Sequence, residues 1–389
     1  MFKKSSIKTA LVAALAVALA APVASAPANA ADDIKIGVLS SISGPYKPYA
    51  DAYVDGLKWG LDYYTGGKNS INGRKIVLTV KDDGTNPATA TAAFKDMVAN
   101  GQNMIVGTVV SAIGQALSPL AQQNKVLYIS GPAKADDITS AANKYTFRSG
   151  NTSLQDFAPL ASLKPIKGKK VIIFTEDTAF GAANIFAAKA YLAAKGAIFT
   201  EIKVPVSATD ITPYAKKAAD VKGDYIFIAW GSTATSGAAF TALAQQKVYA
   251  TARPITGLAT VATYDITGTL FEGTNAILTN SYFPGVVKNK AAAAIAADYA
   301  KAGKTQDLFT SDGVNAALMI LQALKSNPTL STDKMISNLE SFQFVGLKGL
   351  TKVNPTNHTL IQSMYLVKLT KVNGHYVPSL VSTQYNTKV

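Results

Sequence analysis

The residues able to carry acid–base or nucleophilic chemistry are few in this sequence. Only two histidines occur, His358 and His375, and both lie near the carboxyl end in segments typical of loops or turns. Neither stands near a nucleophile motif, so a serine–histidine–aspartate mechanism has no evident base. Glu176 and Asp177 form an acidic pair at the end of a predicted strand, with no visible partner. We therefore predict no catalytic site; the alternative is a secreted hydrolase that uses Glu176 or Asp177.

Signatures of metal and cofactor sites are also missing. No Walker A or Gly-x-Gly-x-x-Gly motif follows a predicted strand. Asp82-Asp83-Gly84 resembles the start of a calcium loop, but the spaced oxygen ligands and the closing glutamate do not follow. Cysteine is absent, which excludes thiol chemistry and cysteine-based metal sites. We predict no cofactor and no metal, and favour a binding protein over an enzyme.

Short β-rich runs alternate with longer helical patterns, and this series occurs twice. The first series predicts strands at 34–39, 75–81, 104–106 and 126–130, and helices at 49–64, 86–100 and 112–123. The second predicts strands at 171–174, 198–204, 225–229 and 254–256, and helices at 180–195, 213–220 and 235–246. Such alternation indicates parallel sheets with right-handed crossovers. The predicted fold class is therefore α/β, with two doubly wound parallel-sheet lobes.

The last third of the chain has a different pattern. Helices are predicted at 291–301, 311–325 and 332–339, followed by strands at 342–350, 363–369 and 376–381. Val372-Asn373-Gly374 is typical of a hairpin turn. No polar or Pro/Gly-rich linker separates the two α/β halves, which suggests a hinge that the chain crosses more than once.

An export signal is predicted over residues 1–31. Lysines precede an apolar stretch of small residues from Thr9 to Ala21, and Ala28-Asn29-Ala30 offers small residues for cleavage near Ala30 or Ala31. The apolar run is shorter than the roughly 20 residues of a membrane span; an uncleaved anchor is the alternative. No cysteine stands at the cut, so we expect a periplasmic protein that is not a lipoprotein.

Composition limits the partners. The 389 residues are 48% hydrophobic and 16% charged, enough for two ordinary domains. The formal net charge is +14, but the lysines are dispersed and no basic run with interleaved aromatics occurs. We therefore expect a solvated cationic surface and no nucleic-acid partner. A surface protein that binds an anionic polymer is an alternative, and it would bind with steep salt dependence.

Several motifs occur in a specific order. They are Ile34–Leu39 with Ser43-Gly44-Pro45, Ile71-Asn72-Gly73-Arg74, Asp177-Thr178-Ala179-Phe180-Gly181, Thr209–Tyr214 and Phe271-Glu272-Gly273. Together they resemble the leucine/isoleucine/valine-binding family, the type I periplasmic binding proteins of ABC transporters. The resemblance implies two lobes that clamp a small ligand by hinge closure. It also implies residues 32–148 plus 282–349 in one lobe, 149–281 plus 350–389 in the other, an ABC permease as partner, and a monomer.

Ser111 is the main candidate for binding a ligand carboxylate. It stands where a helix N-cap would be, so it could offer a hydroxyl and neighbouring backbone N–H groups; the alternative is an ordinary cap. The resemblance places Ala133 and Lys134 in a loop that often supplies carboxylate-binding groups. Lys134 could add a positive charge there, or be a solvated loop lysine.

Aromatic residues are the candidates for the cleft walls. The resemblance implies a ligand contact for Tyr49, with Tyr46 as a weaker candidate, and the alternative is packing at a helix start. Phe180 and Trp230 follow predicted strands of the second lobe, where family members place aromatics facing the cleft. For Trp230 the alternative is the hydrophobic core.

The family's ammonium-binding acids are missing where the resemblance expects them. Neither Thr152, Ser153 nor Ala259 is acidic, and a buried ammonium without a carboxylate is costly. We therefore expect a carboxylate with an apolar or aromatic body, or a neutral amide, unless Asp265 or Glu176 supplies the charge. The function is then capture of an amino acid or related small carboxylate for an ABC importer, with a ligand-sensing receptor lobe as the alternative.

Overall fold

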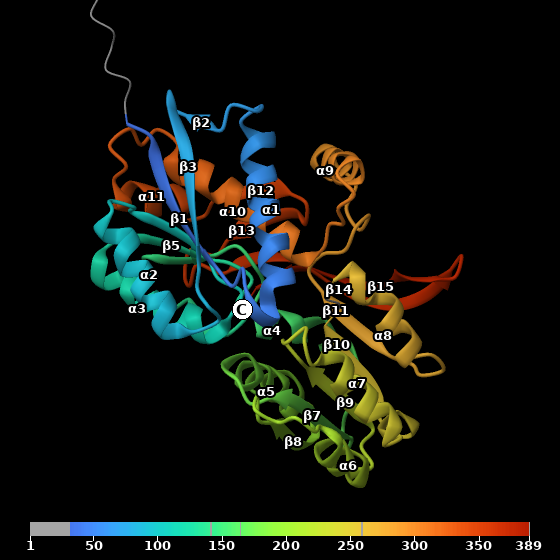
Figure 1. Cartoon of the computed structure of the whole chain (residues 1–389). Coiled ribbons are helices and arrows are strands. Elements are labelled where there is room, and N and C mark those ends of the chain that lie inside the picture. Colours follow the sequence, from blue (N-terminus) through green and yellow to red (C-terminus); the bar gives the residue numbers. More distant parts are fainter. Residues whose placement is uncertain (1–31, 141, 164, 258–259, 389) are drawn as a thin grey trace, which may run out of the picture.

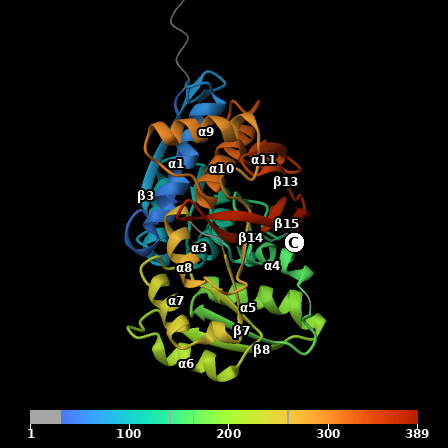
Figure 2. The same ribbon diagram turned by 90° about the vertical axis from the view of Figure 1, so that its right-hand side faces the viewer.

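The computed structural model describes residues 32–388 except 141, 164 and 258–259. The predicted export signal, 1–31, lies outside these residues. Two α/β lobes stand one above the other, each built on its own sheet (Figure 1; Figure 2). The predicted fold class of two α/β lobes is confirmed.

The first lobe is built on a six-stranded sheet. Its strand order is β2 (Ser70–Ile71), β3 (Arg74–Asp82), β1 (Ile34–Ser40), β4 (Met104–Gly107), β5 (Leu127–Ser130) and β6 (Thr146–Arg148). β1 lies parallel to both β3 and β4, with Val38 opposite Val80 and Val106. Only the short β2 is antiparallel to its neighbour β3. The central strands are apolar at successive positions because helices cover both faces.

Helices cover the two faces of this sheet with separate cores. α1 (Lys47–Tyr64), α9 (Lys290–Lys301), α10 (Leu308–Leu324) and α11 (Thr332–Leu339) contribute to the core around Ile36 and Val38. α2 (Pro87–Ala99) and α3 (Ser111–Asn124) cover the other face around Leu39 and Ile105. α1 and α10 approach so closely that a Cβ on Gly56 would lie 2.1 Å from the Thr310 carbonyl oxygen. Glycine is therefore required at that crossing.

The second lobe contains a mixed sheet. Five parallel strands run in the order β8 (Ile198–Val204), β7 (Lys170–Glu176), β9 (Tyr225–Ala229), β10 (Arg253–Gly257) and β11 (Ile277–Asn280). The chain's last strands add antiparallel to this edge as β14 (Leu360–Val372) and β15 (His375–Thr387). Asn373 and Gly374 form the predicted turn between them, both with positive φ. The sheet of the second lobe is therefore parallel as far as β11 and antiparallel at the edge that the terminal strands form.

The helices of the second lobe also lie on two faces. One face carries α5 (Ala179–Leu192) and the short α4 (Ser153–Phe157); the other carries α6 (Thr212–Val221) and α7 (Ser236–Gln245). α8 (Tyr264–Leu270) packs against Val367 and Tyr376 of the terminal hairpin. The predicted single strand at 342–350 is wrong: it is the hairpin β12 (Gln343–Gly346) and β13 (Gly349–Val353). Gly349 makes that turn possible with φ +79°.

The chain passes between the lobes at three places: between β6 and α4, after β11, and along β14, whose Leu360 packs in the core of the first lobe and Leu366 in a core of the second. A buried cluster of polar side chains lies at the second and third of these crossings. Lys348 Nζ lies 2.5 Å from Asp312 Oδ1, donates to Ser281 Oγ at 2.9 Å, and donates to Gln362 Oε1 at 3.2 Å. We call Lys348, Asp312, Ser281 and Gln362 the hinge cluster. The lobe boundaries at 148, 281 and 349 stay a prediction.

Candidate ligand-binding cleft

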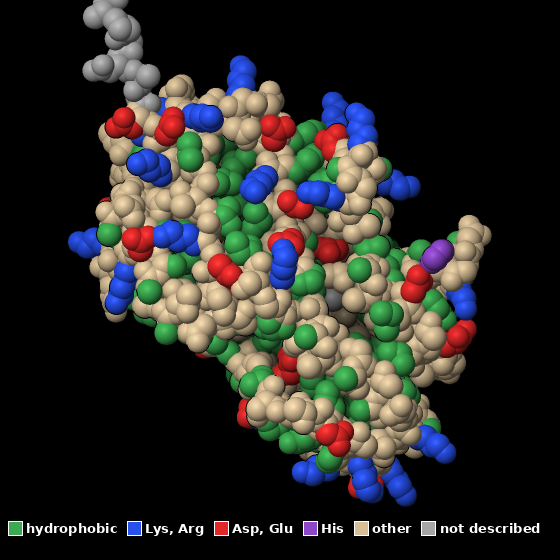
Figure 3. Space-filling view, in the orientation of Figure 1, with side chains coloured by type: hydrophobic (Ala, Val, Ile, Leu, Met, Phe, Trp, Pro, Cys, Tyr) green, Lys and Arg blue, Asp and Glu red, His purple; other side chains and the backbone are tan. Residues whose placement is uncertain are grey.

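A cavity of about 490 Å³ lies between the two lobes. Its walls come from segments that follow β1, β4 and β5 in the first lobe and β7, β9 and β10 in the second. The molecular surface narrows at this level (Figure 3). Open α/β sheets bind ligands at the carboxyl ends of their strands, and both sheets turn those ends toward the cavity. The fold therefore produces one shared site from two separate sheets.

Ser111 lines the cavity at the start of α3. Val110 rather than Ser111 is the N-cap, so the predicted cap is one residue too late and Ser111 is the first helical residue. The Ser111 hydroxyl accepts a hydrogen bond from the Ala135 N–H at 3.2 Å. The first N–H groups of a helix have no acceptor within it, so those of Ser111 and Ala112 can serve an anionic or carbonyl oxygen.

Lys134 lines the cavity but is already paired. Its Nζ lies 2.6 Å from Asp156 Oδ2, and both side chains are largely buried, at 14% and 7% exposure. Asn151 donates to the other Asp156 oxygen at 2.8 Å. The charge of Lys134 is therefore neutralised before any ligand arrives. Asp156 was missed because the acid was sought at 152–153, whereas it lies in the short α4, which carries no clear sequence signal.

Ala133 is fully buried and is not among the residues that line the cavity. Its N–H donates to the Thr108 carbonyl at 3.1 Å, and its carbonyl accepts from Arg148 Nη1 at 2.5 Å. Both backbone groups thus help to hold the loop that carries Lys134.

The four predicted aromatic residues all line the cavity, two from each lobe. Tyr49 stacks on Phe309 with ring centroids 4.3 Å apart. Trp230 stacks on Phe174 at 5.8 Å, and its Nε1 donates to Thr235 Oγ1 at 3.0 Å. Burial, with a smaller contribution from Glu176, raises the pKa of Tyr46 to about 12. The remaining aromatic, Phe180, stands at the start of α5.

Glu176 lies at the end of β7 and lines the cavity with only 4% of its surface exposed. Its Oε2 accepts from the N–H groups of Gly231 at 2.8 Å and Ser232 at 3.2 Å. Burial raises the pKa of this carboxyl above its ordinary value, while the two N–H donors act to lower it. The neighbouring Asp177 has a side chain 61% exposed, 3.9 Å from Lys203.

The other candidate acid lies elsewhere. Asp265 is on α8, where it accepts from the Tyr376 N–H at 2.6 Å and contacts His375 at 2.8 Å, and it does not line the cavity. Thr152 is buried as the cap of α4 and does not line it either. Ala259 lies outside the described residues. Of Asp265 and Glu176, the two acids that the sequence offered as partners for an ammonium group, Glu176 lines the cavity and Asp265 does not.

The suspected calcium motif has a structural role. Asp83 is fully buried and accepts hydrogen bonds from Ser41 at 2.6 Å, from Thr108 and from the Thr85 N–H at 2.9 Å. Within the described part of the chain, no group of three or more metal-ligating side chains could hold an ion.

Comparisons with known proteins agree with this architecture. A family model described as "Periplasmic binding protein" matches residues 33–374. The Leu/Ile/Val-binding protein BraC3 of Rhizobium johnstonii is 32% identical over 166 residues, which are 42% of this chain and 45% of that protein. The Leu/Ile/Val-binding protein of Escherichia coli is 26% identical over 154 residues, 39% of this chain and 41% of that protein. The alignments thus span less than half the length of these curated relatives.

Solved structures extend the similarity to the whole fold. A protein of an ABC-type branched-chain amino acid transporter from Rhodopseudomonas palustris is 28% identical with a TM-score of 0.75, covering 91% of this chain and 97% of that one. A solute-binding protein from R. palustris, solved with 4-hydroxybenzoate, has a TM-score of 0.81 at 21% identity and the same coverage. At that level of identity, the likeness shows a shared fold and nothing more. Because the family model spans nearly all of the described residues, including both lobes, this chain belongs to the periplasmic binding protein family.

Proposed function

We propose that this protein is the solute receptor of an ABC importer, which captures an amino acid or related small carboxylate and delivers it to a membrane permease. The observation that carries the proposal is the cavity of about 490 Å³ whose walls come from both lobes. A site of that size suits a small organic molecule, and walls on two lobes let the ligand hold them together.

The residues at the first-lobe end of the cleft favour a ligand that carries a hydrogen-bond acceptor. The start of α3 presents the Ser111 hydroxyl and free N–H groups, and Tyr49 and Phe309 give an apolar wall beside it. The curated relatives are named for leucine, isoleucine and valine, and one solved neighbour holds 4-hydroxybenzoate. These names support a carboxylate on an apolar body as the ligand class.

The setting of the protein follows from the same proposal. Residues 1–31 serve as a signal peptide cleaved near Ala30 or Ala31, and the mature protein is a periplasmic monomer without a lipid anchor. Within the described residues, every helix is too short or too polar to cross a bilayer. A sensing receptor would use the same cleft, but it would signal to another protein rather than feed a permease.

Ligand capture and hydrolysis predict different outcomes. A receptor returns its ligand unchanged at a ratio of one per chain, whereas a hydrolase using Glu176 or Asp177 consumes it. The Glu176 carboxylate already accepts two backbone N–H groups, which suits a fixed binding group. Mass analysis of the recovered ligand distinguishes the two.

The test is a thermal-shift screen of the mature protein after unfolding and refolding to remove carried ligand. The panel holds branched and aromatic amino acids, their deaminated acids, dicarboxylates and amides. A ligand at a hundred times its dissociation constant adds about 2.7 kcal/mol of stability. Ser111→Ala should weaken the shift, whereas Ser337→Ala, on an exposed helix position far from the cavity, should not. A panel without any saturable shift would overturn the proposal.

A further inference from the structure

We propose that the outer edge of β15 is a docking site, at which an acidic, extended segment of a partner polypeptide adds to the sheet as a further strand. We call the residues from Ser379 to Asn386 the free edge. The free edge is separate from the ligand cleft, because the described residues that line the cavity end at Phe309. A partner held there leaves the cleft available to its ligand.

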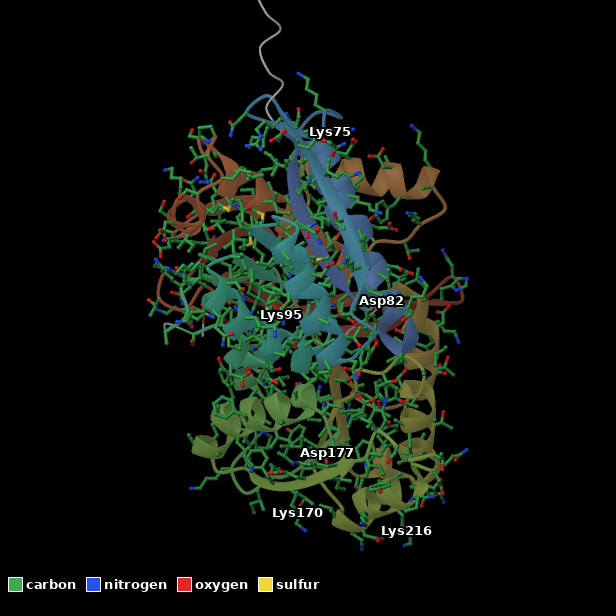
Figure 4. All side chains as sticks on the ribbon, turned by 60° about the vertical axis from the view of Figure 1, so that its left-hand side comes forward. Lys75, Asp82, Lys95, Lys170, Asp177 and Lys216 are labelled. Carbon is green, nitrogen blue, oxygen red and sulfur yellow. The ribbon has the colours of Figure 1, made fainter. Side chains whose placement is uncertain are left out.

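Most edge strands in the described part of this chain are protected against pairing with other molecules. An open strand edge presents unpaired N–H and C=O groups, and short length or charged side chains protect it. β2, β6 and β12 are at most four residues long, and β8 carries Glu201 and Lys203. β3, which continues past the short β2, has charged residues at both ends, among them Lys75 and Asp82 (Figure 4). β15 differs, because its 13 residues include no Lys, Arg, Asp or Glu.

The first part of β15 is protected in another way. The Tyr376 N–H donates to Asp265 Oδ1 at 2.6 Å, and Pro378 has no N–H to donate. The free edge that follows contains no proline. The hydrogen bonds that described residues make to it come from β14 and, at the Gln384 carbonyl, from the Thr387 hydroxyl. Because strands of an antiparallel pair turn alternate N–H and C=O groups away from each other, those on the outer side are open to a further strand.

The side chains of the free edge are uncharged, and several are apolar and exposed. Leu380, Val381 and Tyr385 have exposed fractions of 51%, 50% and 72%. Two register shifts leave Val381 and Tyr385 outside the β14 ladder, and bulges of this kind re-aim side chains at the edges of sheets. A neutral strand edge with apolar side chains pairs readily with another extended chain, so we expect a partner to cover it.

Charge indicates the chemistry of that partner. After Glu340 the sequence contains five lysines and no acidic residue. Lys368 lies opposite Ser379 on β14, Lys388 follows β15, and neither forms an ion pair with a described residue. A second copy of the chain would bring the same lysines, and like charges oppose such a pairing. An acidic segment would neutralise them while its backbone extends the sheet and its apolar side chains cover those of the free edge.

Peptides of defined charge test the proposal on the mature protein by fluorescence anisotropy. The probe is a labelled octapeptide of alternating glutamate and valine, and its lysine–valine counterpart is the control for charge. Two further versions of the acidic peptide carry N-methyl groups on every valine or on every glutamate. Because alternate N–H groups face the neighbouring strand, one of these two versions must lose the hydrogen bonds to β15.

The protein variants reverse two lysine charges at a time. Lys368→Glu/Lys388→Glu changes the charge beside the free edge. Lys95→Glu/Lys170→Glu has the same net charge, but its two positions lie on α2 and at the start of β7 (Figure 4). Neither pair lines the cavity, so the ligand screen of the proposed function should give the same result for both variants and for wild type. A failure of the docking proposal is therefore distinguishable from a failure of the proposed function.

We expect the acidic peptide to bind about tenfold or more tightly than the basic peptide, and Lys368→Glu/Lys388→Glu to lose about tenfold in that affinity. The variant at Lys95 and Lys170 should keep it, and hydrogen exchange should slow at the free edge when the peptide binds. Equal binding of acidic and basic peptides, full binding of both N-methylated versions, equal losses in the two variants, or no binding would each overturn the proposal. Binding of phosphatidylglycerol vesicles or of a second copy in place of the peptide would also overturn it.

Discussion

The hinge cluster and the cleft both contain buried charged side chains. The charges of the hinge cluster are completely paired, whereas the charge of Glu176 in the cleft is paired only in part. In the hinge cluster, the Lys348 ammonium contacts Asp312, Ser281 and Gln362, so its three protons each have an acceptor. In the cleft, the hydrogen bonds to the Glu176 carboxylate from described residues all reach one of its two oxygens, and Ser111 and Ala112, whose N–H groups have no acceptor within α3, line the cavity. A buried polar group that is completely paired maintains the fold, whereas one with a free position is available to a ligand.

The largest effect should come from breaking the hinge cluster. Lys348→Met leaves Asp312 buried and unpaired, at 1% side-chain exposure. We expect a loss of about 3–5 kcal/mol in the free energy of unfolding, measured by urea denaturation. Lys144→Met, which breaks an exposed surface pair with Asp333, should leave the free energy of unfolding almost unchanged. Similar losses of unfolding free energy in Lys348→Met and Lys144→Met would contradict the distinction between the buried hinge cluster and a surface ion pair.

Asp307 gives a pH-dependent test at the start of α10, beside the cleft wall. Burial, only partly offset by the N–H donors of Phe309 and Thr310, raises the pKa of Asp307 to about 7. The unfolded chain has the ordinary value of about 4, so the neutral form favours folding and the folded protein binds the extra proton between those values. The stabilisation is complete below about pH 4 and is lost as the pH rises through about 7.

Asp307→Asn should flatten this part of the pH profile. We expect wild type to lose about 2–4 kcal/mol more than the variant between about pH 4 and 8, measured as the difference between their urea-unfolding free energies. The amide oxygen can still cap α10, so the helix remains. Parallel profiles would show that the pKa of Asp307 is the same in the folded and the unfolded chain, which would contradict the prediction.

The variant Glu176→Gln tests, in the ligand-free protein, whether the buried charge in the cleft destabilises the fold. The amide keeps an oxygen for the Gly231 and Ser232 N–H groups but removes the buried charge. At pH 8 we expect the ligand-free variant to be more stable than wild type by about 1 kcal/mol, measured by thermal unfolding. A loss of stability would place Glu176 with the groups that maintain the fold.

The smallest effect concerns the contact between Pro45 and Thr233. Thr233→Val removes the hydroxyl that donates to the Pro45 carbonyl and keeps the side-chain shape. We expect ligand affinity to fall by about threefold to tenfold because the closed form loses one hydrogen bond. Calorimetry with the best ligand of the panel measures it. Thr370→Val, on an exposed strand position, should leave affinity unchanged.

Sequence patterns predicted the repeating elements well. The strands at Ile198–Val204 and Tyr225–Ala229 and the helix at Thr332–Leu339 have the predicted bounds, because their apolar periodicity is set by a buried face. The short α4 and α8 were not predicted, because elements of five and seven residues carry little periodicity. The β12–β13 hairpin resembled one strand because its short turn between Gly346 and Gly349 contains the apolar Leu347 and therefore does not break the pattern of spaced apolar residues.

Sequence patterns indicated which residue types lie at the cavity, but not how they pair. Tyr49, Ser111, Phe180 and Trp230 stand along the cavity where strand ends and helix starts were expected to place them. The partners of Lys134 and Glu176 could not be read from the sequence. Asp156 lies 22 residues from Lys134, and Gly231 lies 55 residues from Glu176. Whether a buried charge is balanced depends on such distant contacts, which only the folded chain reveals.

Strand β14 has a mechanical consequence. It begins with Leu360 in the core of the first lobe and continues through Leu366 and Val367 in cores of the second. One hydrogen-bonded ribbon thus runs through both bodies. We expect a change in the angle between the lobes to twist this ribbon and so to store elastic energy in it. The affinity measured for a ligand would then include the elastic energy that lobe closure stores in β14.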